Sequence, residues 1–119
     1  MASRTKVTIY HNLRCTKSRE TLHLLRSKGI EPTIIEYLKT PPSKSSLKTL
    51  LKQLGMKPRE LLRTKEEEYK KAGLDKATAS DEQILAAMES HPILIERPIV
   101  VANGKAALGR PPENILKIL

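Results

Sequence analysis

Hydrophobic and polar residues alternate near the N-terminal end of the chain, a pattern that predicts a β-strand. Lys6–Tyr10 alternates in this way and is rich in β-branched residues, so we expect a strand ending near His11. From Thr16 the pattern becomes helical, and Gly29 stands where a helix C-cap glycine belongs. Thr33–Leu38 predicts a second strand. A strand, a helix and a strand in this order predict two parallel strands joined by a right-handed crossover.

The middle of the chain, about residues 41–92, has a helical pattern throughout. Its clearest feature is a set of leucines at the i, i+3, i+4 and i+7 positions before Gly55, namely Leu47, Leu50, Leu51 and Leu54. Pro58 is suited to the start of a short helix, and Ser80 with Gln83 has the spacing of a capping box. This block predicts a helical insertion.

Strand-forming residues return near the C-terminus. Pro98–Ala102 predicts a strand, and Asn103-Gly104 before Lys105–Leu108 predicts a two-residue hairpin turn, since both turn positions need positive φ. The prolines at 111 and 112 are tolerated in the first turn of a last helix.

This order of elements predicts an α/β protein with a thioredoxin-like fold, a mixed four-stranded sheet and a helical insertion. The length of 119 residues suits a single domain, 1–119. In that plan a cysteine at the start of the first helix is the redox-active position, and a proline before the third strand faces it. Cys15 and Pro98 occupy these places, and we expect a cis Arg97–Pro98 bond.

Composition narrows the function classes. The chain has 22 basic and 13 acidic residues, a net charge of +9, but only three Tyr and no Phe or Trp. Stacking platforms for nucleic acid are therefore nearly absent, and we expect no nucleic-acid partner and a lysine-rich solvated surface. No apolar run approaches a membrane span or a signal peptide, so we expect a cytoplasmic protein. One Cys and three His at unrelated spacings predict no metal site.

Cys15 is the only cysteine, and it lies where the first strand gives way to the first helix. Unpaired backbone N–H groups and the helix dipole stabilise a thiolate there, and the same groups can hold an oxyanion. A lone cysteine also occurs as a small buried apolar residue. Arg14, Lys17 and Arg19 make the segment cationic, which favours a nucleophile. Because no internal disulfide can form, a thiol from another molecule must close any redox cycle.

Motifs along nearly the whole chain resemble the arsenate reductase (ArsC) family of the glutaredoxin-coupled type. They are Tyr10-His11-Asn12 with Cys15 and Ser18-Arg19, Glu31 to Ile35, Leu61-Leu62-Arg63, His91 to Val101, and Gly109-Arg110-Pro111. Authentic reductases carry a Pro-Ala-Cys-Gly-Thr-type sequence, whereas Leu13-Arg14 precede Cys15 here. This local form is similar to the reductase-like (YfgD-like) subgroup.

The resemblance implies a role for each matching residue. Cys15 matches the nucleophile, and His11 matches a histidine that helps to keep the cysteine pKa low. Three arginines that bind the oxyanion are matched by Arg63, Arg97 and Arg110. The planar guanidinium of arginine offers several donors and suits this task. Ser18 is expected at the substrate site. The implied reaction is reduction of arsenate to arsenite, with no bound cofactor, glutathione as co-substrate and glutaredoxin as partner. Each arginine taken singly also fits a surface or ion-pair role.

Two other functions are compatible with this reading. One is a thiol oxidoreductase acting on another oxyanion or on a mixed disulfide. The other is a non-enzymatic regulator that binds RNA polymerase, as relatives of the same fold do. Ser18 stands where such regulators often have a second cysteine, which excludes a disulfide switch within that motif. The set of three arginines favours catalysis over docking.

Overall fold

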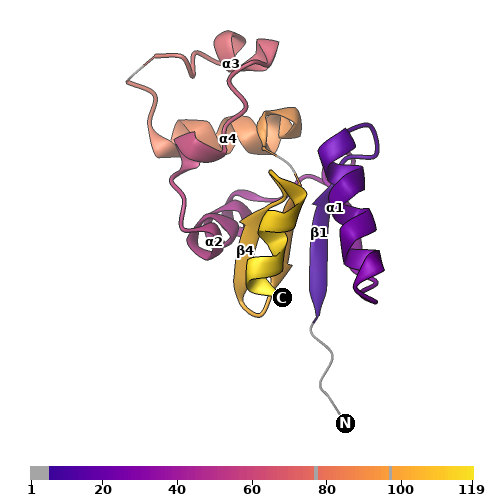
Figure 1. Ribbon diagram of the computed structural model, residues 1–119. Helices are drawn as coiled ribbons and strands as arrows, with labels where there is room; N and C mark the ends of the chain where they lie inside the picture. Colours follow the sequence, from indigo (N-terminus) through magenta and orange to yellow (C-terminus); the bar gives the residue numbers. More distant parts are fainter. Residues whose placement is uncertain (1–5, 77, 97) are drawn as a thin grey trace. The chain divides into compact units, whose positions relative to one another are not determined.

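The computed structural model describes residues 6–76, 78–96 and 98–119, which belong to two compact units (Figure 1). The first unit is Met1–Tyr37 with Arg97–Leu119, and the second is Leu38–Glu96. The helical insertion predicted at about 41–92 lies within the second unit. The single domain, 1–119, stays a prediction.

The first unit is built on the predicted βαβ unit. Its elements are β1 (Val7–His11), α1 (Thr16–Ser27) and β2 (Thr33–Glu36). The strands β1 and β2 are parallel, and His11, the last residue of β1, lies opposite Glu36. The strand predicted over Thr33–Leu38 therefore ends two residues early, because β1 offers no backbone partner beyond His11.

The C-terminal strands complete the sheet. They are β3 (Ile99–Ala102) and β4 (Lys105–Leu108), which pair with each other in an antiparallel hairpin. The strand β3 is also antiparallel to β1, so the sheet has the order β2-β1-β3-β4. Asn103 and Gly104 have φ values of 54° and 73°, as the predicted hairpin turn requires. The α/β fold with a mixed four-stranded sheet is confirmed.

The last predicted helix is present. It is the 3₁₀ helix η3 (Pro112–Ile118). The Asn114 side chain donates to the Leu108 carbonyl oxygen at 3.0 Å. Its backbone N–H donates to the Pro111 carbonyl oxygen at 2.9 Å. These contacts tie the first turn back to β4 with i to i+3 bonding, which favours the tighter helix.

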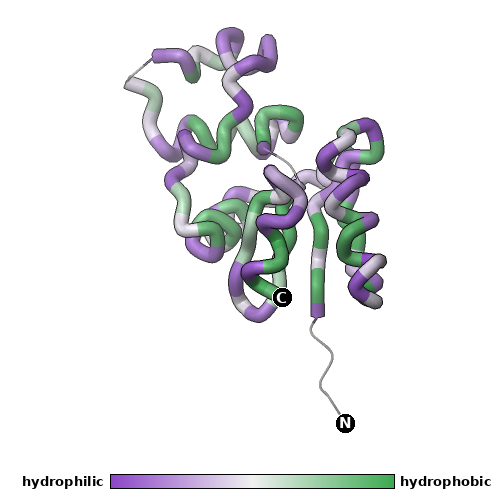
Figure 2. Tube along the Cα trace, in the orientation of Figure 1, coloured by the Kyte–Doolittle hydropathy of each residue, from purple (hydrophilic) through white to green (hydrophobic). Residues whose placement is uncertain are grey.

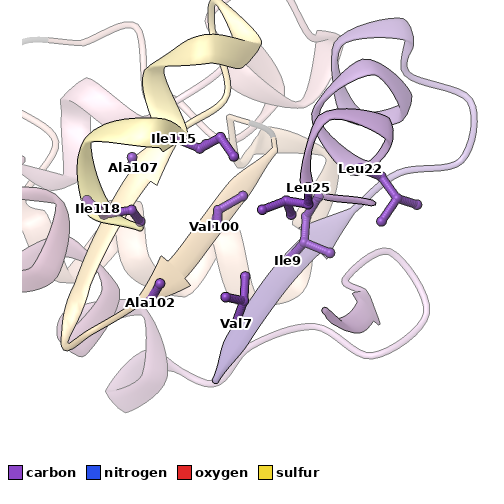
Figure 3. Close-up of a cluster of buried hydrophobic side chains, with 9 residues drawn as sticks. All are labelled: Val7, Ile9, Leu22, Leu25, Val100, Ala102, Ala107, Ile115 and Ile118. Atoms are coloured by element: carbon purple, nitrogen blue, oxygen red, sulfur yellow. The ribbon is translucent and has the colours of Figure 1, made fainter. Parts of the chain in front are cut away.

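One face of the sheet carries the core of the first unit (Figure 3). Ile9 and Val100 are opposite each other in β1 and β3, and both are fully buried. Leu25 of α1 and Ile115 of η3 pack into the same cluster, so both helices cover this face. Burial of each such side chain contributes about 1.5–3 kcal/mol relative to an exposed one. The remaining members are Val7, Leu22, Ala102, Ala107 and Ile118.

The second unit is helical. Its elements are α2 (Lys44–Leu54), η1 (Pro58–Leu61), α3 (Glu67–Lys71), α4 (Asp81–Ser90) and η2 (Pro92–Leu94). Gly55 ends α2 in the left-handed conformation, with φ 68°. Ser80 and Gln83 form the predicted capping box, with bonds of 3.2 and 2.7 Å. Local turn and capping chemistry therefore sets these helix ends.

Apolar and polar positions alternate along these helices, as Figure 2 shows by the change of colour within single turns. In α2 the buried residues are Leu47, Leu50 and Leu51, while Leu54 is only half-buried. None of the helices in the described ranges combines the length and the apolar character needed to cross a bilayer.

Candidate active site

Cys15 is the N-cap residue of α1, one position before the first helical residue. Its backbone is extended, with φ −93° and ψ 122°, and its carbonyl oxygen accepts the first helical hydrogen bond from Arg19 at 3.0 Å. The residue is 9% exposed. Cys15 is therefore a buried residue whose thiol lies at the positive end of a 12-residue helix.

A tight turn before α1 sets the position of the cysteine. The Asn12 carbonyl oxygen accepts from the Cys15 N–H at 3.0 Å, and the Asn12 side-chain oxygen accepts from the Arg14 N–H at 3.0 Å. Asparagine is well suited to this turn because its side chain can bond the backbone two residues further on. The turn projects Leu13 and Arg14 into solvent, and Leu13 is 58% exposed.

His11 and Ser18 hold the same loop from the inside. The Ser18 hydroxyl is hydrogen-bonded to His11 Nδ1 and accepts from the Asn12 N–H at 3.0 Å. Both side chains are buried, with exposed fractions of 1% for His11 and 0% for Ser18. Their contacts connect the end of β1 to the first turn of α1. The structure therefore brings His11 and Ser18 together, and both hydrogen bonds of the Ser18 hydroxyl are made to residues of this loop.

Burial lowers the pKa of His11 below its ordinary value of 6.5. Glu36 opposes this shift, while Arg26 and Arg19 add to it. The imidazole is therefore neutral at neutral pH. Its second ring nitrogen, Nε2, is buried and has no hydrogen-bond partner within the described part of the chain.

Arg110 reaches the sulfur from the C-terminal end of the chain. Its Nη2 lies 3.9 Å from Cys15 Sγ, within the range for a hydrogen bond to sulfur. The two residues are 95 positions apart in sequence. A guanidinium stays charged at any physiological pH, so this contact favours the anionic form of the sulfur.

Close packing at Gly109 determines where Arg110 lies. A side chain at this position would meet the Thr21 hydroxyl of α1 and would come within 2.7 Å of Pro98 Cγ. The Gly109 N–H donates to the Pro98 carbonyl oxygen at 2.9 Å, and Thr21 is fully buried. Glycine is therefore required for the backbone to pass this close to α1.

Arg63 lies in the second unit, directly after η1. Its Nε is 3.4 Å from Glu66 Oε1 and its Nη1 is 3.5 Å from Glu96 Oε1, and the side chain is 20% exposed. Neither nitrogen has a hydrogen-bond partner within the described residues. Both nitrogens are buried, and two carboxylates therefore hold the guanidinium in place.

Two predictions concern Arg97, which lies outside the described residues. Its place at the oxyanion site and the expected cis Arg97–Pro98 bond both stay predictions. Pro98 itself is buried directly before β3, as predicted. The structure has a cis bond between Arg110 and Pro111.

Sequence reasoning missed several residues that position the site. Gly109 and Thr21 place Arg110, and Asn12 shapes the turn before Cys15. Asparagine three residues before the cysteine was a usable turn signal, as was the i, i+3 spacing of Arg63 and Glu66. The contact of Thr21 with Gly109 joins residues 88 positions apart and has no local signal.

No group of three or more His, Cys, Asp or Glu side chains that could hold a metal ion occurs in the described ranges. The chemistry available to this site comes from the Cys15 thiol, the backbone N–H groups of α1 and the Arg110 guanidinium. That set can bind a tetrahedral oxyanion and attack it with sulfur.

Comparisons with known proteins agree with this reading. The model of the ArsC family matches residues 10–118. The uncharacterized protein YfgD of Escherichia coli is 54% identical over 115 residues, which cover 96% of this chain and 97% of that protein. A protein named arsenate reductase in Neisseria meningitidis is 47% identical over 115 residues, covering 96% and 98% of the two chains.

Solved structures show the same similarity. The structure described as an arsenate reductase from Vibrio cholerae matches with a TM-score of 0.96 and 53% identity. It covers 98% of this chain and 100% of that one. A thiol at the N-cap of α1, an arginine on its sulfur and a match over nearly the full length all lead to one assignment: the chain belongs to the ArsC family, with its thioredoxin-like fold.

Proposed function

We propose that this protein is a thiol-dependent arsenate reductase in which the Cys15 thiolate is the nucleophile. The observation that carries the proposal is the contact of 3.9 Å between Cys15 Sγ and Arg110 Nη2 at the N-terminus of α1. The names of relatives such as the Neisseria meningitidis protein support arsenate as the oxyanion.

The first step is attack of the thiolate on arsenic(V). A bond forms between Sγ and arsenic, and one arsenate oxygen takes two protons and leaves as water. Arg110 and the free N–H groups of the first turn of α1 stabilise the negative charge that the oxygens carry during this substitution. Removing one such donor in an oxyanion site typically reduces kcat by about 10²–10³-fold.

Arg63 and Arg97 act on the same oxyanion in this proposal. Arg63, which Glu66 and Glu96 hold in place, is proposed to contribute its positive charge. Arg97 directly precedes Pro98, which contacts the Gly109 turn. Three fixed positive charges would orient the arsenate and offset its repulsion by the thiolate.

His11 and Ser18 are positioning residues in this mechanism. The neutral imidazole bonds the Ser18 hydroxyl, which in turn accepts from Asn12 and so holds the loop that carries Cys15. Ser18 is therefore proposed to influence substrate binding through the shape of the loop. His11 lowers the cost of the thiolate by fixing the helix N-terminus around it, rather than by supplying a positive charge.

The reducing equivalents come from thiols outside the chain. The glutathione sulfur bonds to the Cys15-bound arsenic while an arsenic-bound hydroxyl leaves as water with the thiol proton, and a glutaredoxin thiol then attacks the glutathione sulfur. The two thiol sulfurs join in a mixed disulfide, and the pair of electrons from the broken sulfur–arsenic bond stays on arsenic, which becomes arsenic(III). Water displaces Cys15 and releases arsenite, which regenerates the thiol. A single cysteine in the chain fits this external supply.

The test is arsenate turnover by the purified protein with glutathione and glutaredoxin, followed by arsenite release. Cys15→Ser is expected to abolish turnover. Arg110→Lys, which keeps the charge but loses the planar fork, is expected to lower kcat by at least about tenfold. Lys28→Gln removes a positive charge at the far end of α1 and should leave turnover unchanged.

A wild-type protein that folds but releases no arsenite under these conditions would refute arsenate reduction. Parallel reactions with a glutathione mixed disulfide separate this outcome from a general thiol oxidoreductase. Turnover of the disulfide, with arsenate neither reduced nor inhibitory, would assign the site to that second activity. Persistent arsenite release by Cys15→Ser would remove Cys15 from the reaction.

A further inference from the structure

The proposed reaction needs a second thiol at Cys15, and this chain supplies none of its own. A reducing thiol must therefore approach the arsenic on Sγ from outside and be held there while the sulfur–arsenic bond forms. The question is which surface of the first unit receives it. The following inference rests on the proposed thiol-dependent reduction of an oxyanion bound to Cys15.

A groove of about 430 Å³ lies between α1 and η3, entirely within the first unit. Its α1 wall is lined by Arg19, Glu20, His23, Leu24 and Ser27, and its opposite wall by Pro112 and Glu113. The volume falls at the lower end of the range for small-molecule sites, about 300–1,000 Å³. The groove therefore suits a ligand of tripeptide size, rather than the surface of a folded protein.

Each wall of the groove follows, along the chain, a residue of the contact between Cys15 and Arg110. Arg19 and His23 follow Cys15 at i+4 and i+8, so the three residues lie in one row along α1. Arg19 is about 6 Å along the helix axis from Cys15. On the other wall, Pro112 follows two residues after Arg110, which contacts the sulfur. A ligand in the groove would extend away from the thiol along α1.

The groove carries charges that the described part of the chain does not neutralise. The Arg19 guanidinium has only a long contact to the Thr16 hydroxyl, at 3.4 Å, and no carboxylate partner among the described residues. His23 is exposed, and neither it nor Glu113 makes a hydrogen bond or ion pair through its side chain there. The α1 wall also carries Glu20, which pairs with Lys17 at 4.0 Å. The Arg19 guanidinium and the His23 imidazole on this wall lie across from the Glu113 carboxylate.

We propose that this groove between α1 and η3 is the binding site of the reducing thiol, a zwitterionic peptide thiol of the glutathione class. Arg19 and His23 bind its carboxylates, and Glu113 binds its ammonium group. Leu24 and Pro112 contact its methylene groups. This arrangement directs the thiol of the peptide toward Cys15 at the near end of the groove.

The step that this placement serves is a balanced substitution at arsenic(V). The peptide sulfur bonds to the arsenic on Sγ, and an arsenic-bound hydroxyl leaves as water with the thiol proton. No electrons move in this step, because reduction to arsenic(III) follows only when a second thiol attacks the peptide sulfur. The groove therefore determines the affinity for the peptide thiol and leaves arsenate binding to the arginines of the active site.

Direct binding is the first test. S-methylglutathione, which has no free thiol, is titrated into the ¹⁵N-labelled full chain, and the backbone amide shifts are followed. We expect the largest shifts at Arg19, His23 and Glu113, and a dissociation constant raised about fivefold or more in Arg19→Gln. Lys28→Gln, a matched loss of one positive charge on α1 outside the groove, should bind as the parent does.

Steady-state kinetics form the second test. Arg19→Gln should raise the KM for glutathione about fivefold or more, while the KM for arsenate and the kcat at saturating glutathione stay near parental values. Charge reversal at the opposite wall, Glu113→Lys, should also raise the KM for glutathione. Lys28→Gln again serves as the control.

The outcomes separate this proposal from the proposed function. Amide shifts at the groove in a protein that does not reduce arsenate would support the groove as the binding site of the peptide thiol and would refute arsenate reduction. Arsenate turnover with an unchanged KM for glutathione in Arg19→Gln, or amide shifts located elsewhere on the chain, would refute the groove as the binding site. Arsenate reduction would still stand. Absence of shifts at the glutathione concentrations that support turnover would also overturn it.

Discussion

At the scale of single residues, the position of Cys15 explains why a thiol in this chain can be reactive. It is the N-cap of α1, it is buried with 9% of its surface exposed, and Arg110 Nη2 lies 3.9 Å from its sulfur. Helix N-termini and neighbouring cations both favour thiolates over thiols. The surrounding loop is fixed by buried polar contacts of His11 and Ser18, so the sulfur is held in one place.

The contact with Arg110 predicts the reactivity of Cys15 toward alkylation. Arg110→Gln should lower the rate of reaction with iodoacetamide at pH 7 by about fivefold, since a cation about 4 Å from a thiolate contributes about 1 kcal/mol or more. Arg26→Gln is the matched control, because Arg26 lies on the same helix and pairs with Glu31 at 3.1 Å. Equal rates in both variants would contradict a role of Arg110 at the thiolate.

His11 predicts how stability depends on pH. Its pKa is lowered by burial, so between that pKa and 6.5 the unfolded chain binds a proton that the folded chain does not. The contribution of the neutral imidazole is fully present above pH 6.5 and is lost as the pH falls toward the folded pKa. The free energy of unfolding should then decrease by up to about 1.36 kcal/mol per pH unit.

Urea midpoints measured between pH 7.5 and pH 5 test this dependence. His11→Gln should flatten the slope below pH 6.5, although it also lowers stability at pH 7 through the lost bond to Ser18. His91→Gln replaces an exposed histidine and should keep the parental slope. An unchanged slope in His11→Gln would show that another group is responsible for the loss in acid.

At the scale of elements, the site depends on how closely the segment after β4 approaches α1. Gly109 contacts the Thr21 side chain and Pro98, and the next residue is Arg110. Because the arginine is carried by a backbone segment with no space for a Cβ, small shifts of this segment move its guanidinium away from the sulfur. Packing of one glycine and geometry of the active site are therefore coupled.

Gly109→Ala should destabilise the protein by about 1–3 kcal/mol, as expected for an added methyl in a packed region. It should also slow Cys15 alkylation, because Arg110 moves with its backbone. Thr21→Ala removes one of the two obstructing side chains, so the double variant should be less destabilised than the sum of the single variants. Additive effects measured by urea unfolding would contradict direct contact at Gly109.

At the scale of the whole molecule, the chain combines a discontinuous sheet unit with a helical unit between its two parts. The second unit, Leu38–Glu96, consists of short helices, and units of about 60 residues are marginally stable by themselves. The first unit needs both chain ends, since β1 pairs with β3. These features favour cooperative folding of the whole chain as the single predicted domain.

Hydrogen exchange in increasing urea tests this cooperativity. Protected amides of β1 and β3 and those of α2 and α4 are expected to lose protection at the same urea concentration, within error. Cys15→Ser, which leaves both cores unchanged, should give the same coincidence. Loss of protection in the helical unit well before the sheet unit would show that the two unfold separately.

The sequence alone was sufficient for features that depend on neighbouring residues. Asn103-Gly104 predicted the hairpin turn, Ser80 with Gln83 predicted the start of α4, and the junction before Thr16 predicted Cys15 at a helix N-terminus. Each depends on local φ preferences, capping bonds or hydrophobic periodicity, which act over a few residues. The parallel pair at the N-terminus followed from the same elements through the rules of chain connection.

Only the tertiary structure decided which distant groups meet. The contact of Arg110 with Cys15, the fit of Gly109 against Thr21 and the neutral state of buried His11 depend on packing between elements far apart in sequence. The groove between α1 and η3 likewise exists only after both helices cover the same face of the sheet. Local patterns determine elements, whereas burial and close packing determine the chemistry between them.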